Sequence, residues 1–322
     1  MKETDIILNE AIKKLNKKYD NNVIAKVGEM EYATLKTFST GCYSLDRVFA
    51  CGGLPIGRII EIYGEPSSGK TAMALFILGQ VQKQGGKCMF IDAEFSFDNG
   101  FSEKLGVNTK ELLFSQPNTG EEAINTIEEI AKTKQVDVIV VDSVSSLVPE
   151  AELEGGIDKN SIALQARMLS KGLRILTGLL AKSETTVIFI NQTRMRTGVY
   201  FGNPNTTSGG KSLKFYSSVR LEIKGKKIKG KEDEVVGNIL SITATKNKTG
   251  IPFRKTEISL YFERGIDVTG DLFDVSIQQG IITKAGMTYS IGETKLGAGR
   301  DNAKEYIEKH PEILKEIKSK LK

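Results

Sequence analysis

Eight consecutive residues of the sequence match the pattern of a phosphate-binding loop, G-x-x-x-x-G-K-[ST]. They are Gly64, Glu65, Pro66, Ser67, Ser68, Gly69, Lys70 and Thr71. Glycines let a backbone wrap around phosphate groups, and successive N–H groups at the start of a helix supply positive potential. The Lys70 ammonium adds a charge, and the Thr71 hydroxyl is suited to magnesium. The motif therefore predicts a site for ATP with Mg²⁺.

Two carboxylates could complete the hydrolysis of a nucleotide held by this loop. The apolar run 138–141 ends in Asp142, which we expect to hold the magnesium ion together with Thr71. Attack of water on the terminal phosphate also needs a base or a water-positioning group. The run 90–94 ends in Asp92, Ala93 and Glu94, and we predict that Glu94 activates the water. The alternative for Glu94 is a surface salt bridge.

Strands must place these groups together. Four apolar, β-branched runs, each ending in a polar residue, predict such strands. They are 58–63, 87–92, 136–142 and 185–191. Helical stretches separate these runs, among them 72–84 directly after the phosphate loop. Strands that alternate with helices predict a mostly parallel, twisted α/β sheet flanked by helices, with ligands beyond the carboxyl ends of the strands.

The remaining segments predict additions to this core. Residues 5–18 form an amphipathic pattern, which predicts a helix that docks either on its own domain or on a neighbouring subunit. Residues 219–223 and 237–245 predict antiparallel strands, and the stretch 224–231 between them, with five lysines in eight residues, predicts a solvated hairpin turn. A small α+β domain ending in a charged helix, 301–322, follows. The predicted domains are 1–33, 34–267 and 268–322.

The composition predicts a folded protein and excludes several classes of site. Hydrophobic residues make up 39% and charged residues 26% of the 322, and the net charge of +5 alone does not indicate a nucleic-acid binder. Cys42, Cys51 and Cys88 form no C-x-x-C motif, which argues against disulfides and a zinc ribbon. His310 is the only histidine, which excludes a Ser-His-Asp triad. Without an apolar run of 18 residues or a leader, we expect a cytoplasmic protein and no membrane partner.

Longer stretches of the sequence resemble the bacterial RecA recombinase family from about Leu8 to the final helix. The stretches that carry the resemblance are 39–71, 90–98, 137–149, 189–223 and 245–253. The resemblance implies a RecA-type core that forms a helical filament of many copies on single-stranded DNA. It also implies pairing with homologous double-stranded DNA, strand exchange in recombination and repair, and ATP hydrolysis that depends on DNA.

The resemblance also implies further roles in the ATPase. Asp98 and Phe101 correspond to the adenine contacts, although the family usually has Tyr at the position of Phe101. Gln192 corresponds to the sensor of the γ-phosphate. Lys246 and Lys248 correspond to residues that reach the ATP of the adjacent subunit, where they would act in trans. Taken by themselves, these two lysines would be ordinary exposed residues at a strand end.

Two segments resemble the DNA-binding loops of the family. One runs from Glu154 to Gln165, and the other from Thr193 to Gly210. Cationic side chains and glycine N–H groups suit phosphates, and apolar side chains can stack on bases. The alternative is that the apolar loop residues only pack against the protein. The predicted DNA contacts are Ile162, Arg167, Arg194, Arg196, Phe201, Gly209, Gly210 and Lys211.

Two other functions use the same fold or nucleotide site. A ring-shaped hexameric helicase shares fold and phosphate loop, and a nucleotide-loaded signalling scaffold would assemble without productive turnover. The two loop segments and Thr245-Lys246-Asn247-Lys248 favour the recombinase. The sequence leaves open whether a filament also acts on a LexA-like repressor in an SOS response. It ends at Lys322 without the acidic tail common in the family, so we expect weak restraint of DNA access.

Overall fold

The computed structural model describes residues 3–19, 24–26, 35–155, 163–195, 205–230 and 232–321. The chain forms two compact units, Met1–Lys36 and Thr37–Lys322. The first contains helix α1 (Glu3–Lys18), which is the predicted N-terminal helix. Within this unit, Leu8 is 60% exposed and Leu15 is 37% exposed. The apolar face predicted for this helix is therefore left uncovered by the unit that contains it.

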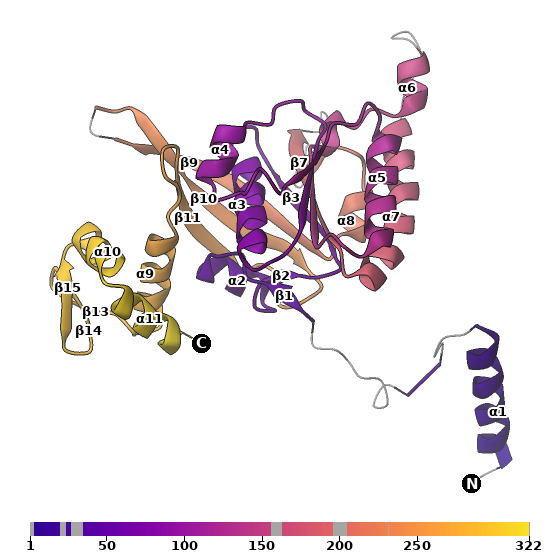
Figure 1. The fold of residues 1–322 in the computed structure, drawn as a ribbon, viewed down its shortest axis with the longest axis horizontal. Coiled ribbons are helices and arrows are strands. Elements are labelled where there is room, and N and C mark those ends of the chain that lie inside the picture. The colour runs from indigo at the N-terminus through magenta and orange to yellow at the C-terminus, as the bar shows by residue number, and fades with distance from the viewer. Residues whose placement is uncertain are drawn as a thin grey trace. The chain divides into compact units, whose positions relative to one another are not determined.

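The second unit is built on a ten-stranded sheet (Figure 1). Five strands run parallel in its centre and on one side, in the order β3-β7-β6-β4-β5, and β9 runs parallel to β3 on the other side. Strands β10, β11 and β12 continue the sheet antiparallel, and the short β8 pairs with β7. The bounds are β3 Ile59–Gly64, β4 Cys88–Asp92, β5 Leu113–Ser115, β6 Val138–Asp142, β7 Thr186–Met195, β8 Asn205–Thr207, β9 Val219–Lys229, β10 Val235–Asn247, β11 Lys255–Tyr261 and β12 Gly265–Ile266.

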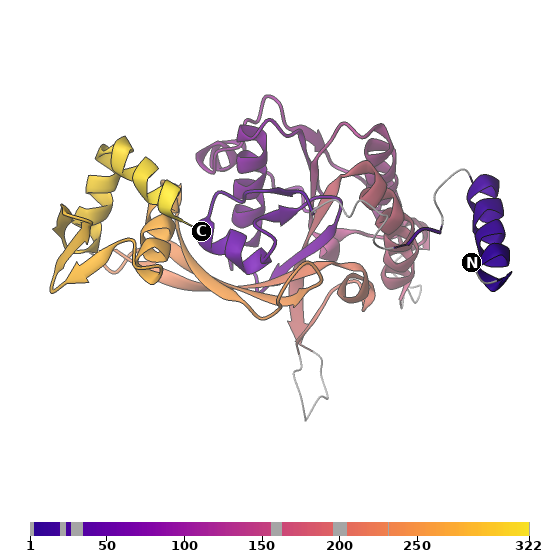
Figure 2. The ribbon, with the colours of Figure 1, turned by 90° about the horizontal axis from the view of Figure 1, so that it is seen from below.

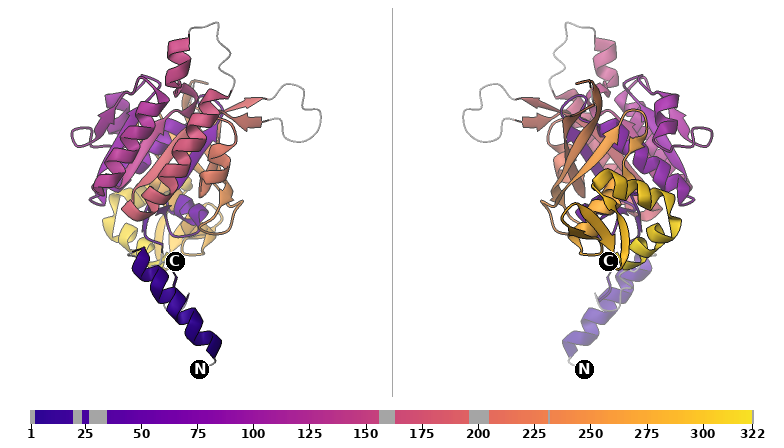
Figure 3. Two further views of the ribbon diagram at one scale, coloured as in Figure 1. Left: turned by 90° about the vertical axis from the view of Figure 1, so that its right-hand side faces the viewer. Right: turned by 90° about the vertical axis from the view of Figure 1, so that its left-hand side faces the viewer.

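Helices cover both faces of the parallel part of the sheet, because successive strand residues point to opposite faces. Val138 and Val140 of β6 lie in the core that includes α2 (Tyr43–Phe49) and α3 (Lys70–Lys83). Ile139 and Val141 lie in the core that includes α5 (Gly120–Thr133) and α7 (Leu164–Ser183), which run side by side (Figure 3). The predicted parallel α/β architecture is confirmed.

A C-terminal region with a small core of its own lies at one end of this unit (Figure 2). Its helix α9 (Val268–Gln278) is fixed by a buried ion pair between Asp267 and Lys304 and by hydrogen bonds from Ser44 to Asp271. The other elements of the unit are β1 Thr37–Phe38, β2 Leu54–Pro55, α4 Asn99–Lys104, the 3₁₀ turn Val144–Ser146, α6 Glu150–Gly155, α8 Ser212–Tyr216, β13 Thr283–Ala285, β14 Thr288–Ile291, β15 Thr294–Ala298, α10 Arg300–Lys309 and α11 Pro311–Lys320.

Two local predictions were wrong. Residues 224–229 of the lysine-rich stretch do not form a turn, because β9 continues through them to Lys229 and pairs with β10. Residues 224–227 and Lys229 are exposed, as expected for a strand that extends beyond the core into solvent. The predicted helix 301–322 is divided between α10 and α11 at His310, since the residue before a proline is disfavoured in helical geometry. His310 has φ −123° and ψ 85°, which is extended rather than helical backbone.

Candidate functional site

The carboxyl ends of four neighbouring strands bring the predicted ATPase residues to one edge of the sheet. In the parallel register, Gly64 at the end of β3 lies opposite Gln192 of β7. Asp92 at the end of β4 lies opposite Asp142 at the end of β6. Open α/β sheets bind their ligands at this edge. Residues that are up to 98 positions apart in the chain, such as Glu94 and Gln192, are therefore in contact.

The phosphate loop has the backbone shape that its glycines permit. Gly69 has φ +91°, and a Cβ at this position would lie 2.6 Å from Leu240, while a Cβ on Gly64 would lie 2.1 Å from the Ile223 carbonyl oxygen. The Ser68 hydroxyl is buried and has no partner among the described residues. Lys70 Nζ donates to the carbonyl oxygen of Glu65 at 2.7 Å. A phosphate would offer acceptors to both groups, so the loop fits a nucleotide.

Thr71 and Asp142, the predicted magnesium ligands, are in direct contact. Thr71 Oγ1 donates to Asp142 Oδ2 at 2.6 Å. Burial raises the pKa of Asp142 to about 6, and the Thr71 hydrogen bond opposes that shift. Burial also lowers the pKa of Lys70, against the pull of Asp142 and Glu94. A hydroxyl beside a carboxylate is a donor set that suits a hard cation such as Mg²⁺.

Glu94 and Asp92 differ in what surrounds them. Asp92 is buried and accepts hydrogen bonds from the Ser96 and Phe97 backbone N–H groups and from Gln116, so it holds the turn after β4. Glu94 is exposed at the surface of the site, where its Oε1 accepts from Ser143 Oγ and from Gln192 Nε2, the latter at 3.0 Å. This geometry leaves Glu94, rather than Asp92, accessible to a water molecule.

The predicted adenine contacts lie at the start of helix α4. Asp98 is the N-cap of this helix, and its Oδ1 accepts from the Phe101 N–H at 2.8 Å. The Phe101 ring is partly buried against the core. The two residues are thus neighbours with fixed positions, which is compatible with a contact surface for a base.

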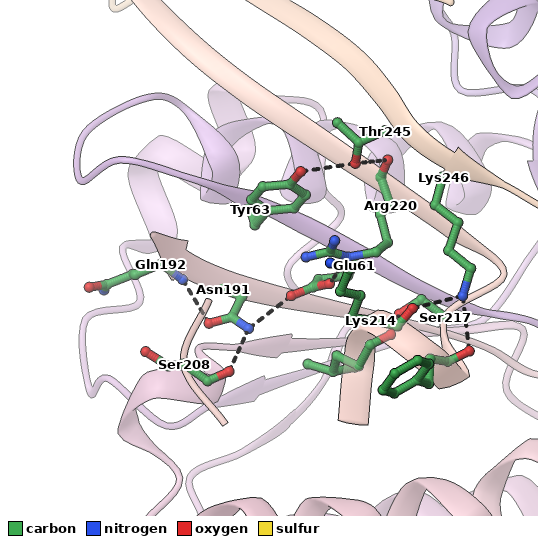
Figure 4. A network of polar contacts seen from close by, with 12 residues as sticks. Glu61, Tyr63, Asn191, Gln192, Ser208, Lys214, Ser217, Arg220, Thr245 and Lys246 are labelled. Carbon is green, nitrogen blue, oxygen red and sulfur yellow. Dashed lines mark hydrogen bonds and ion pairs between the residues drawn. The ribbon is translucent and has the colours of Figure 1, made fainter. Parts of the chain in front are cut away.

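Lys246 owes its direction to a β-bulge in β10. Alternate residues Leu240, Ile242 and Ala244 are buried in one core, and the register then shifts so that Lys246 lies opposite Arg220. The extra residue in β10 turns Lys246 away from that core and toward helix α8. There Lys246 Nζ donates to the carbonyl oxygens of Lys214 and Phe215, at 2.8 and 2.9 Å (Figure 4).

The described parts of the two predicted DNA loops lie close together. Arg194, Gly209 and Gly210 line one cavity with Ala163 and Gln165. Arg167 and Lys211 are exposed at the starts of α7 and α8. Gln165 Nε2 donates to the carbonyl oxygens of Val144 and Leu147, which ties the end of the first loop to the core. Ile162, Arg196 and Phe201 lie outside the described residues.

Sequence reasoning missed a buried polar network beneath the site. Glu61 in the middle of β3 is 0% exposed and contacts Asn191 and Arg220 (Figure 4). A single carboxylate inside the apolar run Ile59-Ile60-Glu61-Ile62 was the available signal, because an unpaired charge is rarely placed in a core. Its partners lie 130 and 159 positions away, and nothing local identifies them.

Comparison with known proteins identifies the family. The family model for the RecA N-terminal domain matches residues 6–267, and that for the RecA C-terminal domain matches residues 270–322. Protein RecA of Thermus aquaticus is 46% identical over 316 residues, which cover 98% of this chain and 93% of that protein. Protein RecA of Halalkalibacterium halodurans is 43% identical over 322 residues, which cover 100% of this chain and 92% of that protein. The chain belongs to the RecA family.

Membership of the RecA family confirms the predicted activity. The protein is a RecA recombinase and a DNA-dependent ATPase, and it binds DNA and forms filaments. The alternatives of a hexameric helicase and a signalling scaffold are not favoured. A solved RadB recombinase shares the fold, with a TM-score of 0.54 and 23% identity over 71% of this chain and 98% of that chain. Among the described residues, no helix is long and apolar enough to cross a membrane.

Proposed function

We propose that residues 64–71 hold the phosphates of ATP, that Thr71 and Asp142 hold Mg²⁺, and that Asp98 and Phe101 contact the adenine. Lys70 exchanges the Glu65 carbonyl for a phosphate oxygen, which is a stronger partner for an ammonium. The buried Ser68 hydroxyl finds an acceptor in the same step. When bound, Mg²⁺ neutralises charge that develops on the phosphates. The buried Ser68 hydroxyl, which has no partner among the described residues, supports this assignment.

Glu94 accepts the proton of the attacking water, and Gln192 senses the γ-phosphate. The Gln192 amide donates to the same Glu94 oxygen that Ser143 contacts. A γ-phosphate offers the Gln192 amide a competing acceptor. When the amide moves from Glu94 to the phosphate, Glu94 Oε1 becomes free to accept from water. Gln192 begins the segment that leads to Arg194, so its movement is passed to the second DNA loop. Binding of ATP is thereby coupled to binding of DNA.

The filament forms on single-stranded DNA and pairs it with homologous duplex. Arg167, Arg194, Arg196 and Lys211 neutralise backbone phosphates. Ile162 and Phe201 stack or wedge between bases, and the N–H groups of Gly209 and Gly210 face phosphate. Both glycines have positive φ and lie against α7, where a Cβ on Gly209 would be 2.3 Å from Leu169. The tight packing of this loop end on α7 supports a fixed position for its cations.

Lys246 and Lys248 act in trans on the ATP of the adjacent subunit. In the isolated subunit Lys246 is held at the end of α8, so its ammonium must leave the Lys214 and Phe215 carbonyls to reach a neighbour. A cation supplied across an interface stabilises the charge of phosphoryl transfer and is worth about three to five powers of ten in rate. DNA then stimulates turnover because it aligns neighbours.

Mixed filaments test the trans assignment. Glu94→Gln alone and Lys246→Ala alone should bind ATP but hydrolyse it slowly on single-stranded DNA. An equimolar mixture should regain turnover, because an intact Glu94 site then meets an intact Lys246 at roughly a quarter of randomly formed head-to-tail interfaces. Strand exchange with homologous and heterologous duplex, measured on the same samples, tests the recombinase reaction. Mixed filaments that form but regain no turnover would refute the trans role.

A further inference from the structure

Glu61 connects three strands of the sheet beneath the nucleotide site. It lies on β3, opposite Phe189 of β7 on one side and Arg220 of β9 on the other. Its Oε1 accepts from Asn191 Nδ2 at 2.9 Å, and its Oε2 accepts from Arg220 Nε. The side chain is 0% exposed and that of Arg220 is 10% exposed. Both oxygens of a buried carboxylate are therefore engaged, one by each neighbouring strand.

On the β7 side, the network reaches the sensor and the end of the second DNA loop. Asn191 Nδ2 also donates to the Ser208 carbonyl oxygen at 3.1 Å, and Asn191 Oδ1 accepts from the Gln192 N–H at 2.9 Å. These contacts use both polar atoms of the Asn191 amide. The amide in turn fixes the orientation of the Glu61 carboxylate toward Arg220.

On the β9 side, the network reaches the bulge that directs Lys246. Arg220 lies opposite Lys246 in the strand register, and its carbonyl oxygen accepts from Thr245 Oγ1 at 3.3 Å. Thr245 Oγ1 also lies 2.9 Å from the Tyr63 hydroxyl. The Arg220 guanidinium covers the Tyr63 ring, 4.5 Å from its centroid. Figure 4 shows Glu61 and Arg220 between Asn191 and Lys246, with Tyr63 and Thr245 above them in this view.

Stability alone does not account for this arrangement. A buried ion pair loses hydration that its attraction barely recovers, and well-packed apolar residues of similar volume are often as stable. What the pair adds is a fixed distance and direction between two strands. The Arg220 side chain donates to Glu61, and the Arg220 backbone carbonyl oxygen accepts from Thr245, the residue that forms the bulge.

We propose that Glu61 is a positioning residue of the ATPase, which through Arg220 and Thr245 sets the direction in which Lys246 is presented to the next subunit's nucleotide. This inference rests on the proposed trans role of Lys246. Glu61 is fully buried, and it acts by holding the bulge of β10 in register. Burial is the largest cause of the lowered pKa of Lys246, and the smaller effects of Arg220, which lowers it, and Glu61, which raises it, are consistent with this proximity.

The variant Glu61→Gln tests this role, because glutamine keeps the shape and removes the charge that holds Arg220. We expect ATP binding by the isolated subunit to change less than about twofold, and DNA-stimulated kcat to fall at least about tenfold with KM for ATP nearly unchanged. Thr245→Val, which deletes the bulge hydroxyl at a half-buried position, should likewise lower kcat and leave KM for ATP nearly unchanged. Thr245→Ser keeps the hydroxyl and should retain most of the activity.

Mixed filaments assign the defect to one side of the interface. A Glu61→Gln subunit has an intact ATP site and a misplaced Lys246, so Glu94→Gln, which supplies a correct lysine, should restore turnover. Lys246→Ala should restore nothing, because both partners then lack a correctly placed lysine. The Glu94→Gln and Lys246→Ala mixture is the control. If that control fails, the proposed trans function is what has failed.

Three outcomes overturn the inference while the control succeeds. The first is full turnover by both Glu61→Gln and Thr245→Val. The second is rescue by Lys246→Ala instead of Glu94→Gln, which would place the effect of Glu61 in its own ATP site. The third is rescue by neither partner although mixed filaments form, which would make Glu61 a residue of fold stability alone.

Discussion

Two neighbouring polar clusters differ in how completely their groups are paired. The nucleotide cluster consists of Ser68, Lys70, Thr71, Glu94, Asp142 and Gln192. Its side chains contact one another or the loop itself, and the buried Ser68 hydroxyl has no partner among the described residues. The lysine cluster consists of Glu61, Tyr63, Asn191, Arg220, Thr245 and Lys246, and the described contacts pair each of its polar side chains.

The difference distinguishes groups that are available to bind a ligand from groups whose hydrogen bonds within the protein hold the site in place. A hydrogen bond to a site's own backbone can be exchanged for a phosphate with little loss. A buried carboxylate that already receives two donors cannot give either up cheaply. Replacing Lys70 by alanine should therefore mainly reduce activity, whereas replacing the buried Arg220 by alanine should mainly reduce stability.

Lys70→Ala should give the largest loss of activity. The substitution removes the charge that neutralises the β- and γ-phosphates, so we expect ATP hydrolysis to fall by at least about a hundredfold. Its free energy of unfolding should change by less than about 1 kcal/mol, because the lost contact is one hydrogen bond to the Glu65 carbonyl. Turnover on single-stranded DNA and denaturant unfolding check the two parts. Normal hydrolysis would remove residues 64–71 from the nucleotide site.

Arg220→Ala should instead give the largest loss of stability. It leaves the buried Glu61 carboxylate without a countercharge, which costs about 3–5 kcal/mol. Lys224→Ala on the same strand is the matched control, because its pair with Glu222 is 3.5 Å long and the lysine side chain is 73% exposed. That control should change the free energy of unfolding by less than about 1 kcal/mol. Equal effects in the two variants, measured by urea unfolding, would contradict the division between the clusters.

The same division decides how much the sequence could predict. The nucleotide cluster lies at strand ends marked by local signals, namely the glycine-lysine motif at 64–71, the run before Asp142 and the run before Glu94. The lysine cluster depends on strand register, since Arg220 meets Glu61 only because β9 lies beside β3. No glycine or proline marks the bulge at Thr245, so the direction of the Lys246 side chain could not be predicted from the sequence alone.

Other differences between the predictions and the structure have identifiable causes. Pro311 was a sufficient signal for the break between α10 and α11, and the prediction of one helix over 301–322 gave it too little weight. The lysines of 224–229 were interpreted as a turn because of their charge, although edge and solvent-facing strands also carry lysines. The contact between Glu94 and Gln192 could not be predicted, because it joins side chains 98 positions apart.

The DNA-binding loops extend the comparison to groups that bind without being buried. Arg167 and Arg194 are exposed, so alanine at either position should leave stability within about 0.5 kcal/mol of the parent. Each should lower affinity for single-stranded DNA and reduce the slope of log affinity against log salt by about 0.7, the value for one phosphate contact on a single strand. Titrations at several salt concentrations measure both quantities. A slope equal to that of the parent would place the residue outside the contact surface.

The smallest expected effect concerns the charge of Lys246. Burial, together with the nearby Lys248 and Arg220, lowers its pKa to about 8, while Glu61 opposes the shift and the α8 carbonyls accept from the ammonium. A lysine with a lowered pKa is charged below that pH and becomes neutral as the pH rises through it. The trans role requires a charged Lys246. At pH 9, about one unit above its pKa, the Lys246 amine must first regain a proton, at a cost of about 1.4 kcal/mol.

We therefore expect DNA-stimulated turnover to fall between pH 7.5 and 9 by less than about tenfold. The variant Lys246→Arg separates this cause from other titrations, because a guanidinium stays charged across the range. Its turnover should be lower than the parent's at pH 7 but should not show the alkaline fall. If both proteins lose activity in parallel, the titrating group is not Lys246. The lysine cluster would then fix the position of this ammonium without controlling its charge.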